Sequence, residues 1–436
     1  MKKLIVISAD ALVFEDLELL KDTPVIGHMM REGAIVKRLR SVYPTVTYVN
    51  HTSMRTGCYP AKHGIVCNYK NAPGADPVPW NFYNDAVKCP DLFDAAKAAG
   101  YTTASISWPV TGNHKNVDYL VDEIWPLDLN GENGPQPFLD EYTKSGTPDW
   151  LLEVISQNVE LRMARRQPDT AWFSTLTACS VIRDYNPDLL MLHIANIDTL
   201  RHDNGVFNDT VSETVRLTDD LVREIVTAVK ANGLLDFTDF VITSDHGQID
   251  VDRQVLPNVI MRDAGLIDVD AEGKVTAWKA WSYEDGGTSA PIVINPSLSD
   301  EEKDAVRLKV YKLFKDRIEA GDSGIEKIFK KEEILEEENL AGEFDFWLET
   351  DGHTYFDLTW TGEESIRPAH KKGSHGHLPD KGPMSTFIGF GPSFKKGAVI
   401  EAAQIVDTAP TYAKILGIDL PDADGHALMG ILSDNI

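Results

Sequence analysis

The sequence has few cysteines for its length, which limits the compartments that suit it. Only 4 of its 436 residues are cysteine, and no two of them form a C-x-x-C pair. A chain of this size does not need disulfide bonds to hold a core together. We therefore expect buried thiols and a reducing, cytoplasmic environment for Cys58, Cys67, Cys89 and Cys179.

Long hydrophobic runs are also lacking. No apolar run reaches the ~18–20 residues that a membrane-spanning helix needs. Met1-Lys2-Lys3 resembles the charged start of a signal peptide, but the apolar run Leu4–Ile7 ends at Ser8. This run is shorter than the ~7–15 residues of a signal-peptide core. We interpret it as a buried first strand and expect no membrane partner.

Positive charge is scarce as well. The chain carries 42 Lys and Arg against 68 Asp and Glu, a formal net charge of −26. A polyanion repels nucleic-acid backbones and anionic membranes, so we expect neither as a partner. A small anionic substrate remains compatible with this charge, because a bound divalent cation can dominate the local field. The oligomeric state is left open by the sequence.

Short β-branched runs alternate with helical patterns, which predicts an α/β fold with a mostly parallel sheet sandwiched by helices. The expected strands are Leu4–Ser8, Thr102–Ser107, Leu189–Ile194, Phe240–Thr243 and Thr386–Phe390. The expected helices are Pro24–Glu32, Pro90–Ala99, a stretch from Val211 to Val229 and Ala402–Leu416.

The regular alternation of strand and helix patterns is interrupted between about Pro257 and Lys372. A glycine-containing turn, the apolar run Pro291–Ile294 and a long polar helix from Asp300 to about Ile318 follow one another there. We interpret residues 257–372 as an inserted, smaller α+β cap subdomain, and residues 1–256 and 373–436 as the catalytic core.

Acids and histidines follow three of the expected strands. Asp10 ends the first strand, Asp198 and His202 follow Leu189–Ile194, and Asp245-His246 follows Phe240–Thr243. The carboxyl ends of parallel strands share one sheet edge, where ligands bind. Carboxylate and imidazole groups are the ligands expected for zinc, and manganese accepts them too. Five such groups exceed what one tetrahedral zinc takes, so we expect two divalent ions.

Several segments match one known family. Residues 43–51 read Tyr-Pro-Thr-Val-Thr-Tyr-Val-Asn-His, 56–60 read Thr-Gly-Cys-Tyr-Pro and 63–68 read His-Gly-Ile-Val-Cys-Asn. Residues 198–205, Ser244-Asp245-His246-Gly247 and Gly373-Ser374-His375-Gly376-His377 supply further motifs. This order resembles the nucleotide pyrophosphatase/phosphodiesterase family of the alkaline phosphatase superfamily.

The resemblance implies an alkaline phosphatase-like fold and a phosphodiesterase or nucleotide pyrophosphatase acting on a small phosphate ester, in the first place a nucleotide. It implies Thr47 as the nucleophile of a phospho-threonine intermediate and Asn68 as a hydrogen-bond donor to a phosphoryl oxygen. It assigns Asp198, His202 and His375 to one zinc ion. The other zinc ion is assigned Asp10, Asp245, His246 and Thr47.

Other interpretations stay open at this point. Tyr48, Trp80 and Phe82 form an aromatic group that either clamps a base or packs its own loop. A phosphonoacetate hydrolase and a phosphomonoesterase are the enzymatic alternatives within the superfamily. A metal-binding scaffold or sensor without turnover is the alternative from another class. His51 and His63 match family positions that are not ligands, and we interpret both as structural.

Overall fold

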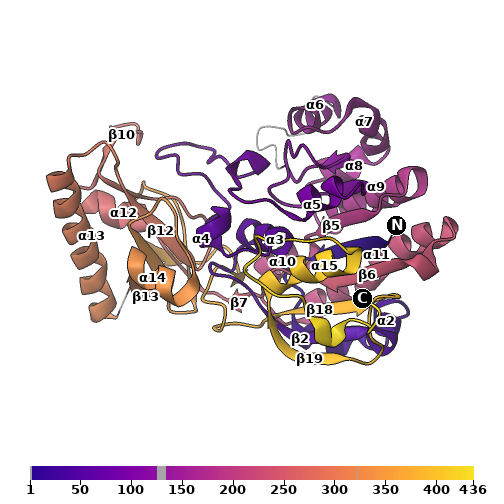
Figure 1. The fold of residues 1–436 in the computed structure, drawn as a ribbon. Coiled ribbons are helices and arrows are strands. Elements are labelled where there is room, and N and C mark those ends of the chain that lie inside the picture. The colour runs from indigo at the N-terminus through magenta and orange to yellow at the C-terminus, as the bar shows by residue number, and fades with distance from the viewer. Residues whose placement is uncertain (1, 125–133, 322) are drawn as a thin grey trace.

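The computed structural model describes residues 2–124, 134–321 and 323–436, and its centre is an eight-stranded sheet (Figure 1). The strand order is β19-β2-β18-β6-β1-β5-β3-β4. The strand β1 (Lys3–Ala9) lies in the middle, parallel to both β5 (Leu189–Ile194) and β6 (Thr238–Thr243). The other strands are β2 (Ala34–Arg40), β3 (Thr103–Ile106), β4 (Tyr119–Val121), β18 (Ser385–Phe390) and β19 (Val399–Gln404).

Helices cover both faces of this sheet because the central strands are apolar on both sides. On β1, Ile5 and Ile7 belong to one hydrophobic cluster, whereas Leu4 and Val6 belong to another. The first cluster is completed by α2 (Ile26–Glu32), α9 (Asp169–Tyr185) and α11 (Asp209–Ala231). The second is completed by α3 (Thr47–Thr56), α5 (Leu92–Ala98) and α15 (Thr408–Leu416). The predicted α/β sandwich is confirmed.

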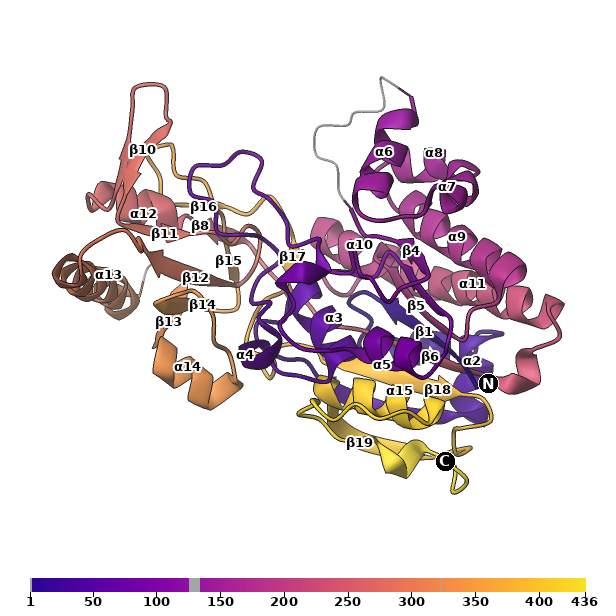
Figure 2. The same ribbon diagram turned by 45° about the horizontal axis from the view of Figure 1, so that its top comes forward.

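A second, antiparallel sheet lies beside the first (Figures 1 and 2). Its order is β11 (Ala280–Ser282), β12 (Ser289–Ile294), β14 (Phe346–Thr350) and β13 (Ile325–Lys330). The helix α13 (Asp300–Ala320) begins at a Ser299–Glu302 capping box and ends at Gly321. This sheet has its own hydrophobic cluster. The boundaries 256/257 and 372/373 stay a prediction.

The remaining α-helices and β-strands of the described ranges are short. The helices are α1 (Leu17–Leu20), α4 (Pro60–His63), α6 (Gln136–Lys144), α7 (Asp149–Ser156), α8 (Val159–Met163), α10 (Asn196–Asn204), α12 (Pro257–Asp263) and α14 (Lys331–Glu338). The strands are β7 (Ile249–Asp250), β8 (Arg253–Val255), β9 (Ile267–Val269), β10 (Val275–Trp278), β15 (Thr354–Phe356), β16 (Ile366–Pro368) and β17 (Gly373–Ser374). Of these, β8, β15 and β16 form a small sheet of their own.

One predicted helix was wrong over its first part. The stretch Ala402–Leu416 was expected to be a single helix, but residues up to Gln404 belong to β19 and Ile405–Asp407 form a 3-10 turn. Helix α15 begins only at Thr408. The cause is pairing with β2, which gives the alanine-rich segment its hydrogen bonds as an edge strand and overrides its helix propensity.

Two further findings concern the thiols and the length of the helices. Cys58, Cys67 and Cys179 are buried, Cys89 is partly buried, and all four are free. Within the described ranges, no helix is both long and apolar enough to cross a membrane. The cytoplasmic location stays a prediction.

Candidate active site

The carboxyl ends of the three central parallel strands deliver acidic side chains to one edge of the sheet. Asp10 follows β1 directly, Asp245 follows β6 after one serine, and Asp198 lies on α10, just after β5. Because β5 and β6 flank β1, these residues from distant parts of the chain come together. They form two groups with His202, His246 and His375, and within each group the potential ligand atoms lie within 4.8 Å of one another.

The first group is Asp10, Asp245 and His246, and all three side chains are buried. The Nε2 atom of His246 lies 3.1 Å from Asp245 Oδ2 and 3.5 Å from Asp10 Oδ1. The hydroxyl oxygen of Thr47 lies 3.2 Å from the same nitrogen. The threonine oxygen therefore lies beside the first group.

The second group is Asp198, His202 and His375. Asp198 Oδ1 lies 3.3 Å from His202 Nε2 and 3.7 Å from His375 Nε2. The rings of His246 and His375 stack with centroids 4.0 Å apart, so the two groups adjoin. The structure thus brings together all seven residues predicted as metal ligands.

Each of the three histidines is oriented by a backbone carbonyl. The Nδ1 atoms of His202, His246 and His375 lie 2.8, 3.2 and 3.2 Å from the carbonyl oxygens of Gly373, Gly247 and Thr45. An N–H at Nδ1 satisfies these contacts and leaves the Nε2 lone pair toward the carboxylates. This is the arrangement in which imidazole binds a metal ion.

The carboxylates at this edge repel one another. Burial raises the pKa of Asp10 well above its usual range, and the Asp245 and Asp198 carboxylates add to the shift, although His193 opposes it. Burial acts in the same direction on Asp245 and Asp198, but the neighbouring imidazoles lower the pKa of both. The buried atoms Asp10 Oδ1 and Asp245 Oδ2 accept no hydrogen bond from any described residue. Divalent cations fit this arrangement of orphaned carboxylate oxygens and free imidazole nitrogens.

Thr47 is the first residue of α3, where the backbone N–H groups have no acceptor within the helix. The preceding Val46 provides no side-chain cap. One of these groups, Tyr48 N–H, donates to Asn68 Oδ1 at 2.9 Å. This bond fixes the Asn68 amide and leaves its N–H donors for another acceptor. Thr47 and Asn68 line one cavity of about 210 Å³, together with Asp10, Asp198, His202 and His375.

The predicted aromatic group is only partly in this cavity. Tyr48 and Trp80 line it and pack against each other, with ring centroids 5.4 Å apart. Phe82 lies 6.4 Å from Tyr48 and packs against the hydrophobic core instead of lining the cavity. Because Tyr48 and Trp80 already touch, a planar group would lie against them and not between them. Substrate binding by the three rings stays a prediction.

His51 and His63 do not line the cavity, and their ring nitrogens have other hydrogen-bond partners. His51 lies 2.8 Å from the Thr47 carbonyl oxygen and 2.9 Å from Ser8 Oγ, and so links α3 to β1. His63 Nε2 lies 3.0 Å from Ser53 Oγ. Burial lowers the pKa of both imidazoles to about 3, which keeps them neutral.

Sequence reasoning missed several groups at the cavity. His193, inside β5, lies 3.0 Å from Asp10 Oδ2 through its Nε2 atom. A histidine within an otherwise apolar buried strand was the available signal. His193 does not itself line the cavity, whereas Glu123, Glu284 and Lys371 do. Lys371 comes from a segment far along the chain, and no local pattern marks it.

A third Asp/His group lies elsewhere in the core. Asp91, Asp94 and His114 also place their potential ligand atoms within 4.8 Å of one another. The buried guanidinium of Arg55 forms an ion pair with Asp91, and His114 Nε2 lies 3.0 Å from the same carboxylate. The Arg55 guanidinium therefore already balances negative charge in this group.

Comparisons with known proteins agree with the motifs. The chain is 23% identical over 435 residues to ectonucleotide pyrophosphatase/phosphodiesterase family member 1 of Rattus norvegicus, covering 94% of this chain and 40% of that protein. It is 24% identical over 428 residues to family member 7 of Homo sapiens, covering 93% of this chain and 78% of that protein. The chain therefore spans less than half of the first relative.

Two solved structures share the fold. Murine ectonucleotide pyrophosphatase/phosphodiesterase 5, in an inactive threonine-to-alanine form in complex with AMP, gives a TM-score of 0.67 at 17% identity, over 99% of this chain and 100% of that chain. The human counterpart gives 0.68 at 16% identity, over 100% of both chains. The family profile described as type I phosphodiesterase / nucleotide pyrophosphatase matches residues 4–378. Because that match covers most of its length, the chain belongs to the type I phosphodiesterase / nucleotide pyrophosphatase family of hydrolases.

Proposed function

We propose that this chain is a metal-dependent phosphodiesterase or nucleotide pyrophosphatase that hydrolyses small phosphodiesters through a phospho-threonine intermediate. The observation that carries the proposal is the position of Thr47 Oγ1, 3.2 Å from His246 Nε2 and beside two adjoining Asp/His groups. A free threonine hydroxyl is a weak nucleophile at neutral pH and needs such surroundings to react.

Two divalent cations, zinc in the first place and manganese as the alternative, fit the two groups. Asp10, Asp245, His246 and Thr47 would hold one cation. The other would be held by Asp198, His202 and His375. When bound, such ions lower the pKa of a coordinated hydroxyl and neutralise the charge of a phosphodiester.

The chain's own residues then supply positioning and the covalent step. Thr47 Oγ bonds to phosphorus and releases its proton to solvent, and the leaving group departs with the electrons of the broken P–O bond. Water later attacks phosphorus and breaks its bond to Thr47 Oγ. One water proton goes to that oxygen and restores the hydroxyl, and the remaining hydroxyl stays on the phosphate monoester that is released. The amide donors of Asn68 and the free N–H groups at the start of α3 stabilise the phosphoryl oxygens throughout.

A nucleotide is the first substrate to test. Both relatives carry nucleotide pyrophosphatase in their names, and the murine structure was obtained with AMP and with a threonine replaced. Trp80 offers aromatic surface beside Thr47 for a base, whereas the Tyr48 ring is buried and packs against Trp80. Neither a nucleic-acid polymer nor a membrane is expected as a partner.

The test is hydrolysis of bis(4-nitrophenyl) phosphate by zinc-replete protein, with and without a chelator. We expect turnover that the chelator abolishes and added zinc restores. Faster hydrolysis of 4-nitrophenyl phosphate would favour a phosphomonoesterase, and release of phosphate from phosphonoacetate would favour a phosphonoacetate hydrolase. Metal binding without turnover of any of these compounds would favour a scaffold or sensor.

A further inference from the structure

Two of the four free thiols belong to segments that pack side by side. Cys58 comes just after the end of α3 and is buried. Cys89 lies just before α5 and is partly buried. Both helices contribute to the same hydrophobic cluster, so the two cysteines lie on the same side of the central sheet.

Contacts on either side of the two cysteines hold their segments together. One contact is the ion pair between Arg55 and Asp91. The other is a hydrogen bond of 3.0 Å from the Lys88 N–H to the His63 carbonyl oxygen. In each segment the cysteine lies between the residues that make these two contacts, so the segments bring the two thiols together.

The two thiols interact directly. A hydrogen bond from the Cys89 thiol holds the pKa of Cys58 below its usual range, although burial opposes the shift. The same bond is the main cause that raises the pKa of Cys89. Cys58 in turn donates to the Asp422 carbonyl oxygen at 3.2 Å. The thiolate is the reactive form of cysteine, and a thiolate beside a second thiol forms a disulfide bond once an oxidant arrives.

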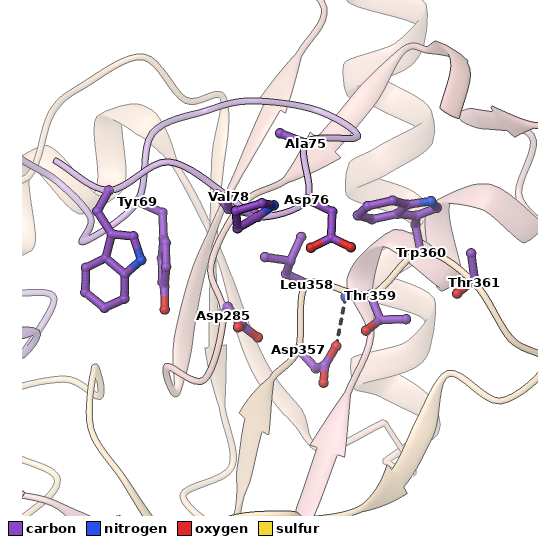
Figure 3. A pocket seen from close by; sticks show the side chains of 12 residues that line it. Tyr69, Ala75, Asp76, Val78, Asp285, Asp357, Leu358, Thr359, Trp360 and Thr361 are labelled. Atoms are coloured by element: carbon purple, nitrogen blue, oxygen red, sulfur yellow. Dashed lines mark hydrogen bonds between the residues drawn. The ribbon is translucent and has the colours of Figure 1, made fainter. Parts of the chain in front are cut away.

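The chain between the two cysteines forms a loop beside the candidate active site. Its residues Asn68, Tyr69 and Trp80 line the cavity of that site. The same loop forms one wall of a second cavity of about 470 Å³, which lies between residues 69–80 and the segment 357–361 (Figure 3). A bond between the two cysteines would therefore close the base of a loop that shapes both cavities.

We propose that Cys58 and Cys89 form a redox modification site, at which a peroxide joins the two thiols in a reversible disulfide bond. The bond closes the base of the loop 69–80 and limits how far this wall of both cavities can open. It acts on the shape of the site without involving the predicted metal ligands. Transient disulfides of this kind are typical of redox-sensing proteins in reducing compartments.

The reaction has two steps. The sulfur of Cys89, the less buried thiol, attacks one oxygen of hydrogen peroxide, the O–O bond breaks, and the products are a sulfenic acid and one water molecule. The sulfur of Cys58 then attacks the Cys89 sulfur, the S–O bond breaks, and the oxygen leaves as a second water molecule. The thiol protons leave in the two water molecules. The two thiols together lose two electrons, which reduce the peroxide, and a reducing dithiol reverses the change.

The test is oxidation of the purified chain with a small excess of hydrogen peroxide, then alkylation with N-ethylmaleimide in denaturant, tryptic digestion and mass spectrometry. We expect the peptides 56–62 and 89–97 to be joined with the loss of two hydrogens, and dithiothreitol to separate them. Cys67 and Cys179 should remain free thiols. Absence of the joined peptides, or a bond from either peptide to another cysteine, would overturn the inference.

Matched variants test what the bond does to the loop. Oxidation should raise the melting temperature of the wild type by a few degrees and slow hydrogen exchange in residues 69–80, because the bond restricts the chain. Cys89→Ser, at the less buried position, should show neither change, even if Cys58→Ser does not fold. Cys179→Ser removes a buried thiol from α9 and should respond as the wild type does.

A disulfide bond that leaves hydrogen exchange in the loop unchanged would refute the closure of the loop, as would an equal response in Cys89→Ser. Neither measurement depends on turnover. The disulfide bond and the proposed function can therefore fail separately.

Discussion

Two regions of this protein contain the same kinds of side chain and differ in how their charge is balanced. The group Asp91, Asp94 and His114 contains the buried guanidinium of Arg55, which also donates to Asn84 and to the Val110 carbonyl. Asp94 accepts from the Asn116 side chain at 2.7 Å. The protein itself therefore satisfies this group.

The groups at the edge of the central sheet are not satisfied in this way. Asp10 Oδ1 and Asp245 Oδ2 accept no hydrogen bond from the described part of the chain, although both are buried. Carboxylate and imidazole residues alone do not make a metal site. What distinguishes the candidate site is charge that the described residues leave unbalanced, and a buried carboxylate must find an arginine, a metal ion or a proton.

Replacing the nucleophile should have the largest effect. In Thr47→Ala, turnover of the diester should fall by ~10⁴–10⁶-fold, because the oxygen that bonds to phosphorus is gone. Metal content should persist, since the six Asp and His side chains remain. Steady-state kinetics and elemental analysis on the same sample check both points. Substantial residual turnover would show that water attacks directly.

Removing the Arg55 guanidinium should destabilise the folded protein. In Arg55→Met, the buried Asp91 carboxylate loses its ion pair, and the free energy of unfolding should fall by ~3–5 kcal/mol. Urea denaturation measures this change, and Asp91→Asn combined with Arg55→Met should recover part of the loss. A change below ~1 kcal/mol would contradict the balancing role of Arg55, whereas recruitment of a metal ion by the variant would support the distinction between the two regions.

Asn68 should matter less than Thr47. In Asn68→Ala, kcat should fall by ~10²–10³-fold, as expected for one donor to a developing negative charge. Asn68→Asp tests the same position with similar shape but acceptors only, and should be at least as slow. Comparison of kcat with KM decides the matter, because a loss confined to KM would place Asn68 in ground-state binding.

A proton is the third means of neutralising a buried carboxyl group. The loss of such a proton from Glu284 should have the smallest of the effects predicted here, on the stability of the protein. Burial raises the pKa of Glu284 to about 8 from an ordinary 4.5, although its bond from Cys67 opposes the shift. Between these values the folded chain keeps a proton that the unfolded chain has lost, so the stability of the wild type falls as pH rises toward 8.

Glu284→Gln has no such proton to lose. The melting temperature of the variant minus that of the wild type should therefore increase by a few degrees from about pH 5 to about pH 9. Scanning calorimetry at both pH values measures the difference. A constant difference across this range would contradict the protonated state of Glu284.

Much of the site could be predicted because parallel strands impose it. Once Leu189–Ile194 and Phe240–Thr243 were assigned as strands beside the first one, Asp10, Asp198 and Asp245 had to converge. Local pattern also predicted a long polar helix from Asp300 to about Ile318, and the structure has α13 over Asp300–Ala320.

The rest depends on pairing between distant segments, which leaves no local pattern. The strand β19 forms by pairing with β2, which lies more than 350 residues earlier in the chain. The second cavity requires the loop 69–80 to meet residues 357–361, and Lys371 enters the first cavity from that same part of the chain. The guanidinium that occupies the third Asp/His group comes from α3 and is separated in sequence from the residues it binds.

The most direct test of the central claim is the metal content of the purified protein, measured by inductively coupled plasma mass spectrometry after dialysis against zinc. The wild type should hold two ions per chain, His246→Ala and His375→Ala should each hold about one, and His114→Ala should still hold two. Equal content in all four proteins, or a loss confined to His114→Ala, would contradict the account.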